Sequence, residues 1–576
     1  MNTIPRPEHP LPQWERKNWK NLNGTWEFDF DFGRTARDRK LYESTDKLSR
    51  EITVPFCPES RLSGIGYTDF ISAVCYKRSF TLTEDDLSGR VFLHFGAVDY
   101  ESYVYINGVL AGKHTGGYTS FKYDITALAH AGENTLFVIA DDDCRDGRQP
   151  SGKQSKLYYS HGCDYTRTTG IWQTVWLEMT PKSYVKSAKY YPDIHAGRLT
   201  VIGETVGAGE LTIKSSFMGR DTGSCTVDAK GGAFTAVIDL SEKHLWEVGR
   251  GELYDLEFRF GDDCVKSYFG LREVRLEGMK FMLNDRSVFQ RMVLDQGFYP
   301  DGIYTAPSDE ALLNDINLSL AVGFNGARLH EKVFESRFLY HCDRLGYIVW
   351  GEYPNWGFDH NSPQATERYL NEWAEAVERD FNHPAIIGWC PFNETWGYSE
   401  ARSCNTLLST IYKYTKTVDP TRVVIDTSGN YHSVTDIYDV HDYNQDPVSF
   451  KANYDAFIEG GEFYDRVNNS FKHDSLTQQY KGEPVFMSEY GGIRWNISGR
   501  EGWGYGEAPK TGEEYIERFT KLADALLDNP KFMGLCYTQL YDVEQELNGV
   551  YTYERAPKFD PDIFKAVLSR KAAIED

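Results

Sequence analysis

Residues 382–397 have the sequence NHPAIIGWCPFNETWG, in which an apolar run from Ala385 to Cys390 leads directly into Asn393 and Glu394. A short apolar run of this kind is typical of a strand that is buried on both faces, as in a parallel sheet. A carboxylate that follows such a strand is a helix cap, a solvated loop charge or a catalytic group. The choice depends on what the rest of the chain places beside Glu394.

Seven further apolar runs alternate with amphipathic helical segments between residues 273 and 576. Eight strands with interleaved helices over about 300 residues are the pattern of a (β/α)8 barrel, whose strand ends surround one mouth. Polar residues recur at the carboxyl ends of these runs: Asp295, Arg328, His330, Glu352, Glu394, His441, Tyr443, Glu489 and Asp542. Solvated loop charges would not favour one end of every strand, so we expect these side chains to line a single pocket.

The chain before residue 273 has short alternating apolar runs, which predict strands rather than helices. Residues 1–182 predict a β jelly roll or sandwich, and residues 183–272 predict an immunoglobulin-like β-sandwich. Asn107-Gly108 lies between two alternating runs and predicts a tight hairpin. The catalytic barrel is then expected over residues 273–576.

Composition excludes several classes of partner. The formal net charge of −23 argues against nucleic acid and membranes, because anionic polymers and lipids bind basic surfaces. No apolar run approaches the roughly 20 residues of a membrane span, and the amino terminus has no signal-peptide core. The 10 cysteines show no CxxC pair, which favours reduced thiols in a cytoplasm. We therefore expect a cytoplasmic protein without a metal site.

Glu394 ends the fourth apolar run and Glu489 ends the seventh, so the two carboxylates face each other across the predicted mouth. Such a pair is the minimum for glycoside hydrolysis, in which one carboxyl group protonates the leaving oxygen while the other attacks the sugar or activates water. A separation of about 5–5.5 Å gives retention of configuration, and about 6.5–9.5 Å gives inversion. Arg328 and Tyr443 would lower the pKa of Glu489, as a nucleophile requires.

Other side chains near the two glutamates are candidates for sugar binding. Asn393 can hydrogen-bond a hydroxyl beside the reacting carbon, and Trp396 can line the leaving-group side. His441 is a candidate donor to a hydroxyl, and Trp495 is a candidate stacking platform. Candidates for further substrate contacts are His330 and Glu352 together with three acceptors, Asp542, Glu544 and Glu546.

These segments resemble glycoside hydrolase family 2, which includes β-galactosidases, β-glucuronidases and β-mannosidases. RDFNHPAIIGWCPFNE (379–394) is similar to the family's acid/base strand, and FMSEYGG (486–492) is similar to its nucleophile strand. TRTTGIWQTVWLE (166–178) resembles the family's amino-terminal jelly roll, which implies that residues 1–182 are a sugar-binding domain. The resemblance implies that Glu394 is the acid/base and Glu489 the nucleophile of a retaining reaction. It also implies an oligomer, and Mg²⁺ near the acid/base is possible by resemblance alone.

The departures from the family pattern concern the sugar. Glu331-Lys332-Val333 stands where the family has a His-Tyr-Pro that helps galactosidases bind hydroxyls. Glucuronidases of the family use Asn-x-Lys to hold the sugar carboxylate, but this chain has Glu546-Leu547-Asn548, and a glutamate would repel a uronate. We therefore expect a retaining exo-glycosidase that removes the non-reducing terminal neutral sugar from glycosides or oligosaccharides, most simply a β-galactosidase. A β-galactofuranosidase or α-L-arabinofuranosidase is the alternative.

Two other functions fit the same fold. A transglycosidase would use the same residues and differ in the acceptor. A non-catalytic carbohydrate-binding protein would keep the fold without the chemistry, but such a protein usually loses a catalytic carboxylate, and here both are present.

Overall fold

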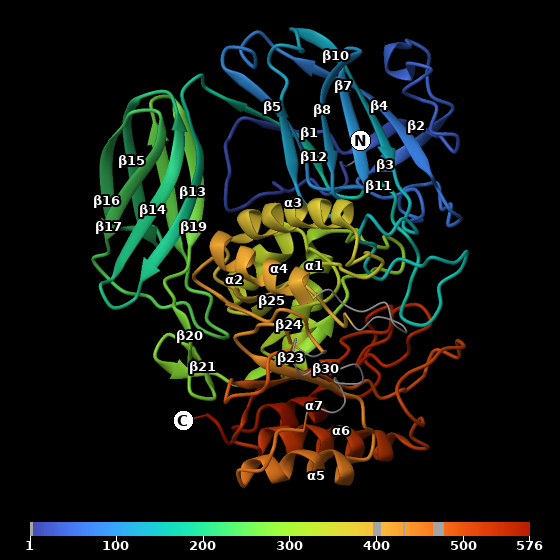
Figure 1. Cartoon of the computed structure of the whole chain (residues 1–576). Coiled ribbons are helices and arrows are strands. Elements are labelled where there is room, and N and C mark those ends of the chain that lie inside the picture. The colour runs from blue at the N-terminus through green and yellow to red at the C-terminus, as the bar shows by residue number, and fades with distance from the viewer. Residues whose placement is uncertain (1–3, 396–404, 430–431, 465–476, 576) are drawn as a thin grey trace.

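The computed structural model describes residues 4–395, 405–429, 432–464 and 477–575. Its carboxyl-terminal half is an eight-stranded parallel sheet that curls into a barrel (Figure 1). In chain order the strands are β23 (Gln290–Asp295), β24 (Gly326–Leu329), β25 (Ile348–Glu352), β26 (Ile386–Cys390), β27 (Val423–Val424), β28 (Tyr438–Asp442), β29 (Val485–Gly491) and β30 (Phe532–Thr538). All eight predicted runs are therefore strands.

The barrel sheet has one seam, between β27 and β28, where no ladder pairs occur among the described residues. A backbone hydrogen bond of 3.0 Å from Asp436 N to Val424 O spans the seam. Every other neighbouring pair of strands is hydrogen-bonded in the order β27-β26-β25-β24-β23-β30-β29-β28. The strands thus surround one mouth, as predicted.

Helices pack around the barrel strands. They are α1 (Asp309–Ala321), α2 (Ser336–Leu345), α3 (Pro363–Asp380), α4 (Asn405–Val418), α5 (Pro447–Ile458), α6 (Gly512–Leu527) and α7 (Pro561–Leu568). The sequence analysis missed α5, although its start was recognisable: Asp446 caps the helix by accepting from Val448 N and Ser449 N, and Pro447 occupies the first turn. Within the described ranges, every helix is too short or too polar to span a bilayer.

The amino-terminal part is a sandwich of antiparallel strands, as expected for a jelly roll. One sheet contains β1 (Trp19–Asn21), β12 (Val175–Thr180), β5 (Arg90–Phe95) and β9 (Phe121–Asp124). The other contains β3 (Arg50–Val54), β2 (Gly24–Phe30), β4 (Ala73–Leu82), β10 (Gly132–Asp141), β7 (Glu101–Ile106) and β8 (Val109–Thr115). A two-stranded sheet, β6 (Val98–Asp99) with β11 (Gly170–Ile171), and a short helix, η1 (Leu41–Glu43), complete it.

The predicted hairpin joins β7 to β8. Asn107 and Gly108 both have positive φ, 51° and 80°, which is the turn that two-residue hairpins favour.

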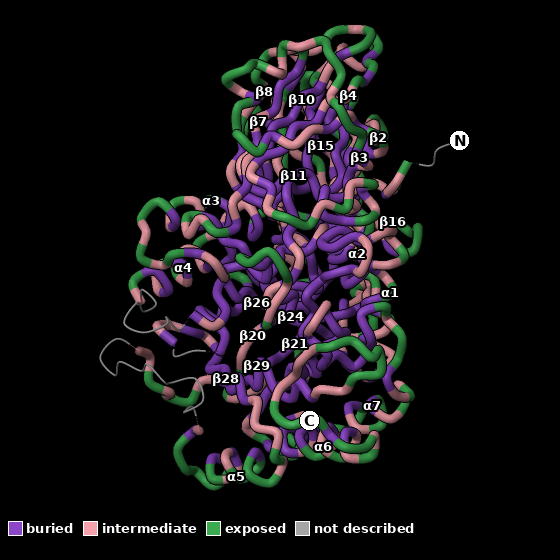
Figure 2. Tube along the Cα trace, turned by 90° about the vertical axis from the view of Figure 1, so that its right-hand side faces the viewer, coloured by how far each residue is buried: buried purple, intermediate pink, exposed green. Residues whose placement is uncertain are grey.

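A second sandwich follows. Its sheets are β13 (Tyr184–Asp193), β14 (Arg198–Val206) and β17 (Gly232–Asp239) against β16 (Arg220–Ala229), β15 (Gly209–Phe217), β18 (Tyr254–Phe260) and β19 (Asp263–Phe269). A small sheet of β20 (Val274–Glu277), β21 (Lys280–Leu283) and β22 (Arg286–Ser287) leads from it into the barrel. Each sandwich has an apolar core of its own, and the barrel core extends into the jelly roll through residues such as Tyr118, Tyr165 and Trp172. Figure 2 shows buried backbone running through the interior of the molecule. The boundaries at residues 182 and 272 stay predictions.

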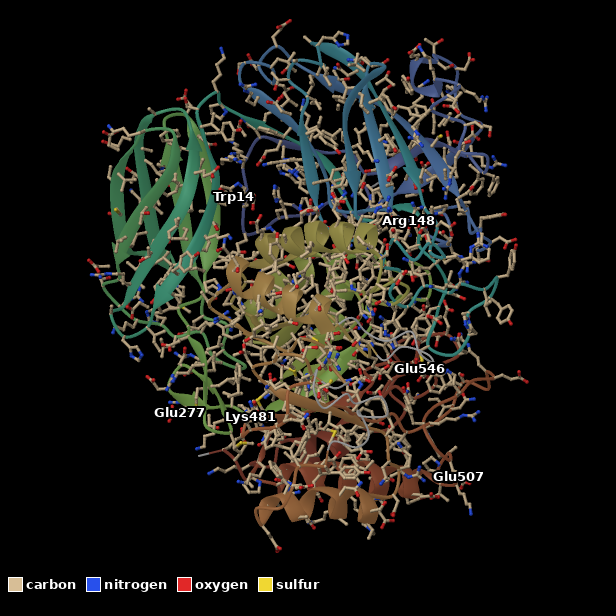
Figure 3. All side chains as sticks on the ribbon, viewed as in Figure 1. Trp14, Arg148, Glu277, Lys481, Glu507 and Glu546 are labelled. Carbon is tan, nitrogen blue, oxygen red and sulfur yellow. The ribbon has the colours of Figure 1, made fainter. Side chains whose placement is uncertain are left out.

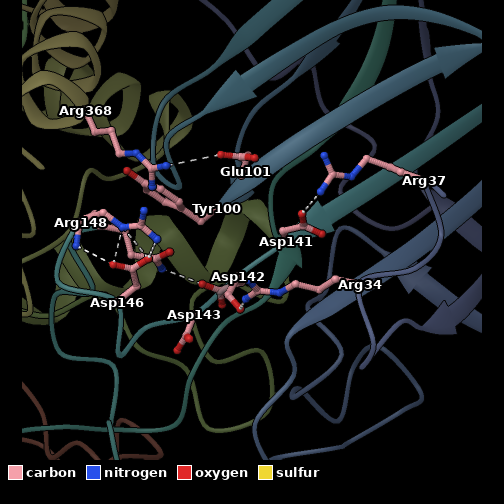
Figure 4. Close-up of a pocket in the computed structure, with 11 residues that line it drawn as sticks. Arg34, Arg37, Tyr100, Glu101, Asp141, Asp142, Asp143, Asp146, Arg148 and Arg368 are labelled. Atoms are coloured by element: carbon pink, nitrogen blue, oxygen red, sulfur yellow. Dashed lines mark hydrogen bonds and ion pairs between the residues drawn. The ribbon is translucent and has the colours of Figure 1, made fainter. Parts of the chain in front are cut away.

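The jelly roll rests on helix α3, as Figure 1 shows. Glu372 on this helix accepts a hydrogen bond from Tyr118 N at 2.6 Å, and Glu375 accepts from Thr119 Oγ1 at 2.7 Å. Beside this contact lies a polar cavity of about 240 Å³ (Figure 4). Three of its four arginines are paired with carboxylates, and the pair of Arg368 on α3 with Glu101 on β7, at 3.6 Å, joins the two layers.

Arg16 joins the two sandwiches. Its guanidinium is 4% exposed and binds Glu178 of β12 and Asp263 of β19, each at 2.8 Å. The same side chain donates to Val185 O at 2.7 Å. One buried cation thus satisfies one carboxylate from each sandwich.

We predict that Arg16→Ala lowers the free energy of unfolding by about 3–5 kcal/mol, because it leaves Glu178 and Asp263 buried without their partner. Chemical denaturation followed by circular dichroism measures this change. Arg198→Ala is the matched control: it breaks the exposed pair between Arg198 and Asp239 on the second sandwich and should cost less than about 1 kcal/mol. Equal losses in the two variants would contradict the structural role of Arg16.

Candidate active site

Arg328, on β24, is the centre of the barrel mouth. Its side chain is 1% exposed. It donates from Nε to Glu352 Oε1 at 2.5 Å, from Nη1 to Glu489 Oε1 at 3.0 Å and from Nη2 to Asn393 Oδ1 at 3.1 Å. The predicted contact between Arg328 and Glu489 is therefore present. Because each partner comes from a different strand or strand end, one guanidinium fixes the positions of three site residues.

Glu394 and Glu489 approach each other through His441, on β28. His441 Nδ1 lies 2.8 Å from Glu394 Oε1 and 3.4 Å from Glu489 Oε2. One carboxylate oxygen of each glutamate and a ring nitrogen of His441 all lie within 4.8 Å of one another. The two carboxyl groups thus face the same small volume at the mouth of the barrel.

The backbone at Glu394 follows from its neighbours. Glu394 has a φ of 48° and donates its N–H to Ser428 O at 2.8 Å. Asn393 is held from both sides, since its N–H donates to Asn355 Oδ1 at 2.7 Å and its carbonyl accepts from Asn355 Nδ2 at 3.0 Å. Asn393 Nδ2, in contrast, is buried and has no hydrogen-bond partner among the described residues.

The charges around Glu489 keep it ionised. Burial by itself would raise the pKa of Glu489, but the positive charges of His441 and Arg328 and a hydrogen bond from the Tyr443 hydroxyl lower it to about 2. Burial would likewise lower the pKa of His441, but Glu489 and Glu394 raise it above its ordinary value. A protonated His441 therefore lies where its Nδ1 hydrogen is close to both carboxylates.

Tyr443 and His330 complete the surroundings of Glu489. The ring of Tyr443 stacks on Tyr505 with the centroids 3.5 Å apart, which fixes the direction of its hydroxyl toward Glu489. His330 Nδ1 lies 3.2 Å from Glu352 Oε2 and 4.0 Å from Glu489 Oε1. Six of the predicted site residues therefore form one connected group with the two glutamates: Arg328, His330, Glu352, Asn393, His441 and Tyr443.

The three predicted acceptors after β30 are already bound by protein groups. Asp542 Oδ1 pairs with Lys558 Nζ at 2.6 Å. The Glu544 carboxylate accepts from Thr166 N at 3.1 Å. Glu546 accepts from the Tyr165 hydroxyl and from Asn548 Nδ2 at 3.0 Å. Asp542 thus stabilises the loop, while the other two fasten it to the jelly roll; Figure 3 labels Glu546 on the barrel below the jelly-roll loops.

Of the two predicted tryptophans, Trp495 lies among the described residues. Trp495 packs against Phe559 and Tyr515, with ring centroids 5.4 and 6.0 Å away, so a stacking role for it stays a prediction. Trp396 lies outside the described residues.

Sequence reasoning missed the contribution of the jelly roll to this mouth. Lys153 and Tyr165 reach the barrel from a loop more than 100 residues before the first barrel strand. A faint signal existed in the run SGKQSK (151–156), which is rich in small and polar residues and is followed by the family-like stretch at 166–178.

Glu394, His441 and Glu489 are also the one group of three metal-binding side chains found among the described residues. An imidazole with two carboxylates suits Zn²⁺ better than Mg²⁺, which prefers oxygen ligands. The group does not fit the Mg²⁺ site that the resemblance suggested. A cation here would also compete with the proton of His441 and with Arg328.

Comparison with known proteins identifies the family. Residues 19–181 match the sugar-binding domain of glycosyl hydrolases family 2, and residues 274–558 match the TIM barrel domain of the same family. The chain belongs to glycoside hydrolase family 2. It is therefore an O-glycoside hydrolase, and its metal dependence, oligomeric state and cellular location stay predictions.

Relatives and solved structures agree with this family. The chain is 23% identical to a β-glucuronidase from Paenibacillus borealis, over 82% of this chain and 83% of that protein. It is 25% identical to a β-galactosidase from Thermoanaerobacterium thermosulfurigenes, over 74% of this chain and 61% of that protein. The structure of a β-glucuronidase from an uncultured Clostridium sp. has a TM-score of 0.78 at 20% identity and covers 96% of this chain and 98% of its own. This last likeness concerns the fold.

The low pKa of Glu489 predicts how the stability of the folded state depends on pH. The charge of this group favours the folded state above its unfolded pKa of about 4.3, and that contribution is lost as the pH falls toward 2.

Arg328→Met removes a neighbouring positive charge, so the pKa of Glu489 should rise and the acid limb of kcat/KM should move to higher pH. Tyr443→Phe, which removes one hydrogen bond, should move the limb less in the same direction.

The measurement is the pH dependence of kcat/KM on an aryl glycoside. Arg500→Met serves as the control, because Arg500 pairs with Glu554 on the surface and should leave the profile unchanged. An acid limb that stays in place in Arg328→Met would contradict the electrostatic role of Arg328.

Proposed function

We propose that the chain is a retaining exo-glycosidase in which Glu489 is the nucleophile and Glu394 the general acid and base. The observation that carries this proposal is the approach of the two carboxyl groups, with one oxygen of each within 4.8 Å. Inverting enzymes need about 6.5–9.5 Å to admit a water molecule between the carboxyl groups. The spacing here instead suits direct attack on the anomeric carbon.

Each group has a separate task in the two steps. Glu489 attacks the anomeric carbon while Glu394 gives its proton to the departing oxygen, so the glycosidic bond breaks as an ester to Glu489 forms. Glu394 then removes a proton from water, which attacks the same carbon and releases Glu489. Arg328, His441 and Tyr443 stabilise ionised Glu489 at both ends of this cycle. Asn393 Nδ2, which lacks a protein partner among the described residues, is available to a sugar hydroxyl.

For the sugar, we propose a neutral terminal residue, with a β-galactopyranoside first. By the family resemblance, Glu546 and Asn548 stand in place of the Asn-x-Lys with which glucuronidases hold the uronate, and the two are hydrogen-bonded to each other. A sugar carboxylate in this place would meet a glutamate. β-Glucuronides are the second candidate, because most of the reported relatives carry that name. None of these relatives is named for a furanoside, so β-galactofuranosides and α-L-arabinofuranosides follow behind.

The roles of the two glutamates can be separated by azide. Glu394→Ala should still form the glycosyl-enzyme from a dinitrophenyl glycoside, whose leaving group needs no proton, and should then stall. Azide needs no base, so it should restore turnover and give a glycosyl azide of retained configuration. Without azide, hydrolysis of less activated substrates should fall by about 10²–10⁴-fold.

Glu489→Ala is the matched partner in this experiment. It should form no intermediate, and azide entering from its side should give the inverted product. NMR of the products reads the configuration for both variants. Swapped outcomes would reverse the two roles, and full activity in both variants would overturn the proposed mechanism.

A panel of nitrophenyl glycosides tests the sugar. We expect kcat/KM for the β-galactoside to exceed that for the β-glucuronide by about 10²-fold, because like charges placed together cost several kcal/mol. The furanosides belong in the same panel, and an excess of an alcohol acceptor reveals transfer in place of hydrolysis. A glucuronide that is cleaved as fast as the neutral glycosides would overturn the preference for a neutral sugar.

A further inference from the structure

A loop of the jelly roll, residues 151–155, enters the mouth of the barrel. Ser151 N and Gly152 N donate to Trp356 O at 2.8 and 3.1 Å, and the carbonyl of Lys153 accepts from Tyr165 N at 2.7 Å. Gly152 has a φ of 54°, and a Cβ at this position would lie 2.7 Å from Glu331 O. Glycine therefore permits the close approach that brings the next residue, Lys153, against the barrel.

Lys153 is a buried residue whose ammonium group lies against an aromatic ring. The residue is 6% exposed, and its Nζ lies 3.8 Å from the centre of the Trp356 ring. In the part of the chain that the structure describes, no side-chain oxygen is within hydrogen-bond or ion-pair distance of this Nζ. An ammonium has three donors, and a buried charge without acceptors is costly. The nearby ring supplies part of the compensation as a cation–π contact.

Two more unpartnered polar atoms lie around the same tryptophan. Glu331 is 1% exposed; its Oε2 accepts from Trp356 N at 3.1 Å, but its Oε1 has no partner among the described residues. Trp356 Nε1 donates at 3.3 Å to the carbonyl of Asn393, whose side-chain Nδ2 is the other such atom. Buried polar atoms are nearly always paired. These unpaired atoms therefore indicate that a ligand binds here and supplies their partners.

Glu331 also has an unusual backbone. Its φ of 51° is in the left-handed region, which costs a non-glycine residue about 1–3 kcal/mol and persists where the surroundings or a function require it. The jelly-roll loop packs on its carbonyl, and Trp356 links Glu331 to Asn393, the residue before Glu394. Lys153 and Glu331 therefore lie near the catalytic pair.

We propose that Lys153 and Glu331 together bind adjacent hydroxyl groups of the terminal sugar, Lys153 as donor and Glu331 as acceptor. This inference rests on the proposed function and names two specificity residues for it, one of them from the jelly roll. A hydroxyl both donates and accepts, so a pair of neighbouring hydroxyls satisfies the ammonium and Glu331 Oε1 together. A sugar carboxylate would satisfy the ammonium alone and would face Glu331.

The test compares Lys153→Met with Lys156→Met on the neutral glycoside that the wild type cleaves fastest. Methionine keeps the length of the side chain and removes the charge. Lys156 is on the same loop, is exposed and lies 3.5 Å from the Gly357 carbonyl, so its variant should behave as the wild type. Lys153→Met should lose about 10–10²-fold in kcat/KM, the range for a hydrogen bond to a charged group. Glu331→Gln, which keeps the shape of Glu331, should also lose activity.

Deoxy substrates identify the hydroxyls. In a series of glycosides that each lack one hydroxyl, at least one should be cleaved by Lys153→Met and the wild type at rates within about twofold, because the contact is already absent. Circular dichroism and thermal melting of all variants exclude a loss of folding, and Lys153→Arg, which keeps the charge, should recover part of the activity.

Three results would overturn the inference. Lys153→Met could lose activity equally on every deoxy substrate, which would mean a structural role. It could lose activity on an aryl glucuronide and keep it on neutral glycosides, which would make Lys153 a carboxylate-binding residue. Lys153→Met could have the same kcat/KM as an active wild type on neutral glycosides. That result would overturn the inference and leave the proposed function intact. A wild type that cleaves no glycoside would instead overturn the proposed function itself.

Discussion

The guanidinium of Arg328 lies below the barrel mouth and is almost completely excluded from water. A buried cation is stable only where carboxylates and carbonyls surround it, and here Glu352, Glu489, Asn393 and the Ser488 carbonyl do so. These partners come from three other strand positions around the barrel. The placement of Arg328 therefore determines the directions of Glu489 and Asn393, and with them the geometry of the pocket.

His441 adds a second constraint to this arrangement. Two carboxylates as close as Glu394 and Glu489 repel each other, and an imidazolium that contacts both reduces this repulsion. Because His441 also lies 2.9 Å from Ser428 Oγ, its ring cannot turn freely. The result is an asymmetric pair: Glu489 is surrounded by Arg328, His441 and Tyr443, while Glu394 has His441 as its hydrogen-bonded side-chain neighbour.

The barrel and its central residues could be predicted because the signals for them are local in the sequence. An apolar run that ends in Glu394 or Glu489 identifies a strand and its mouth-facing end at once, and Arg328 follows from the same pattern. The partners of Asp542 and Glu546 could not be predicted, since Lys558 and Tyr165 meet them only after folding. Lys153 was missed for the same reason: its neighbours Trp356 and Glu331 are about 200 residues away in the chain. Helices α5 and α7 were both missed, although an Asp-Pro pair marks the start of each, Asp446-Pro447 and Asp560-Pro561.

The close contact of Gly152 with Glu331 has a consequence for exchanging domains between this enzyme and its relatives. The barrel core also contains jelly-roll side chains such as Tyr118, Tyr165 and Trp172, so a chimera that combined this barrel with the jelly roll of a relative would have to repack that interface. Its mouth would also meet a foreign loop in place of the one that contacts Glu331, Glu544 and Glu546. On the proposed function, substitutions in a loop far from the catalytic strands would redirect sugar preference while the reacting carboxylates stay in place. The barrel carries both glutamates, and the contacts at its mouth come from two domains.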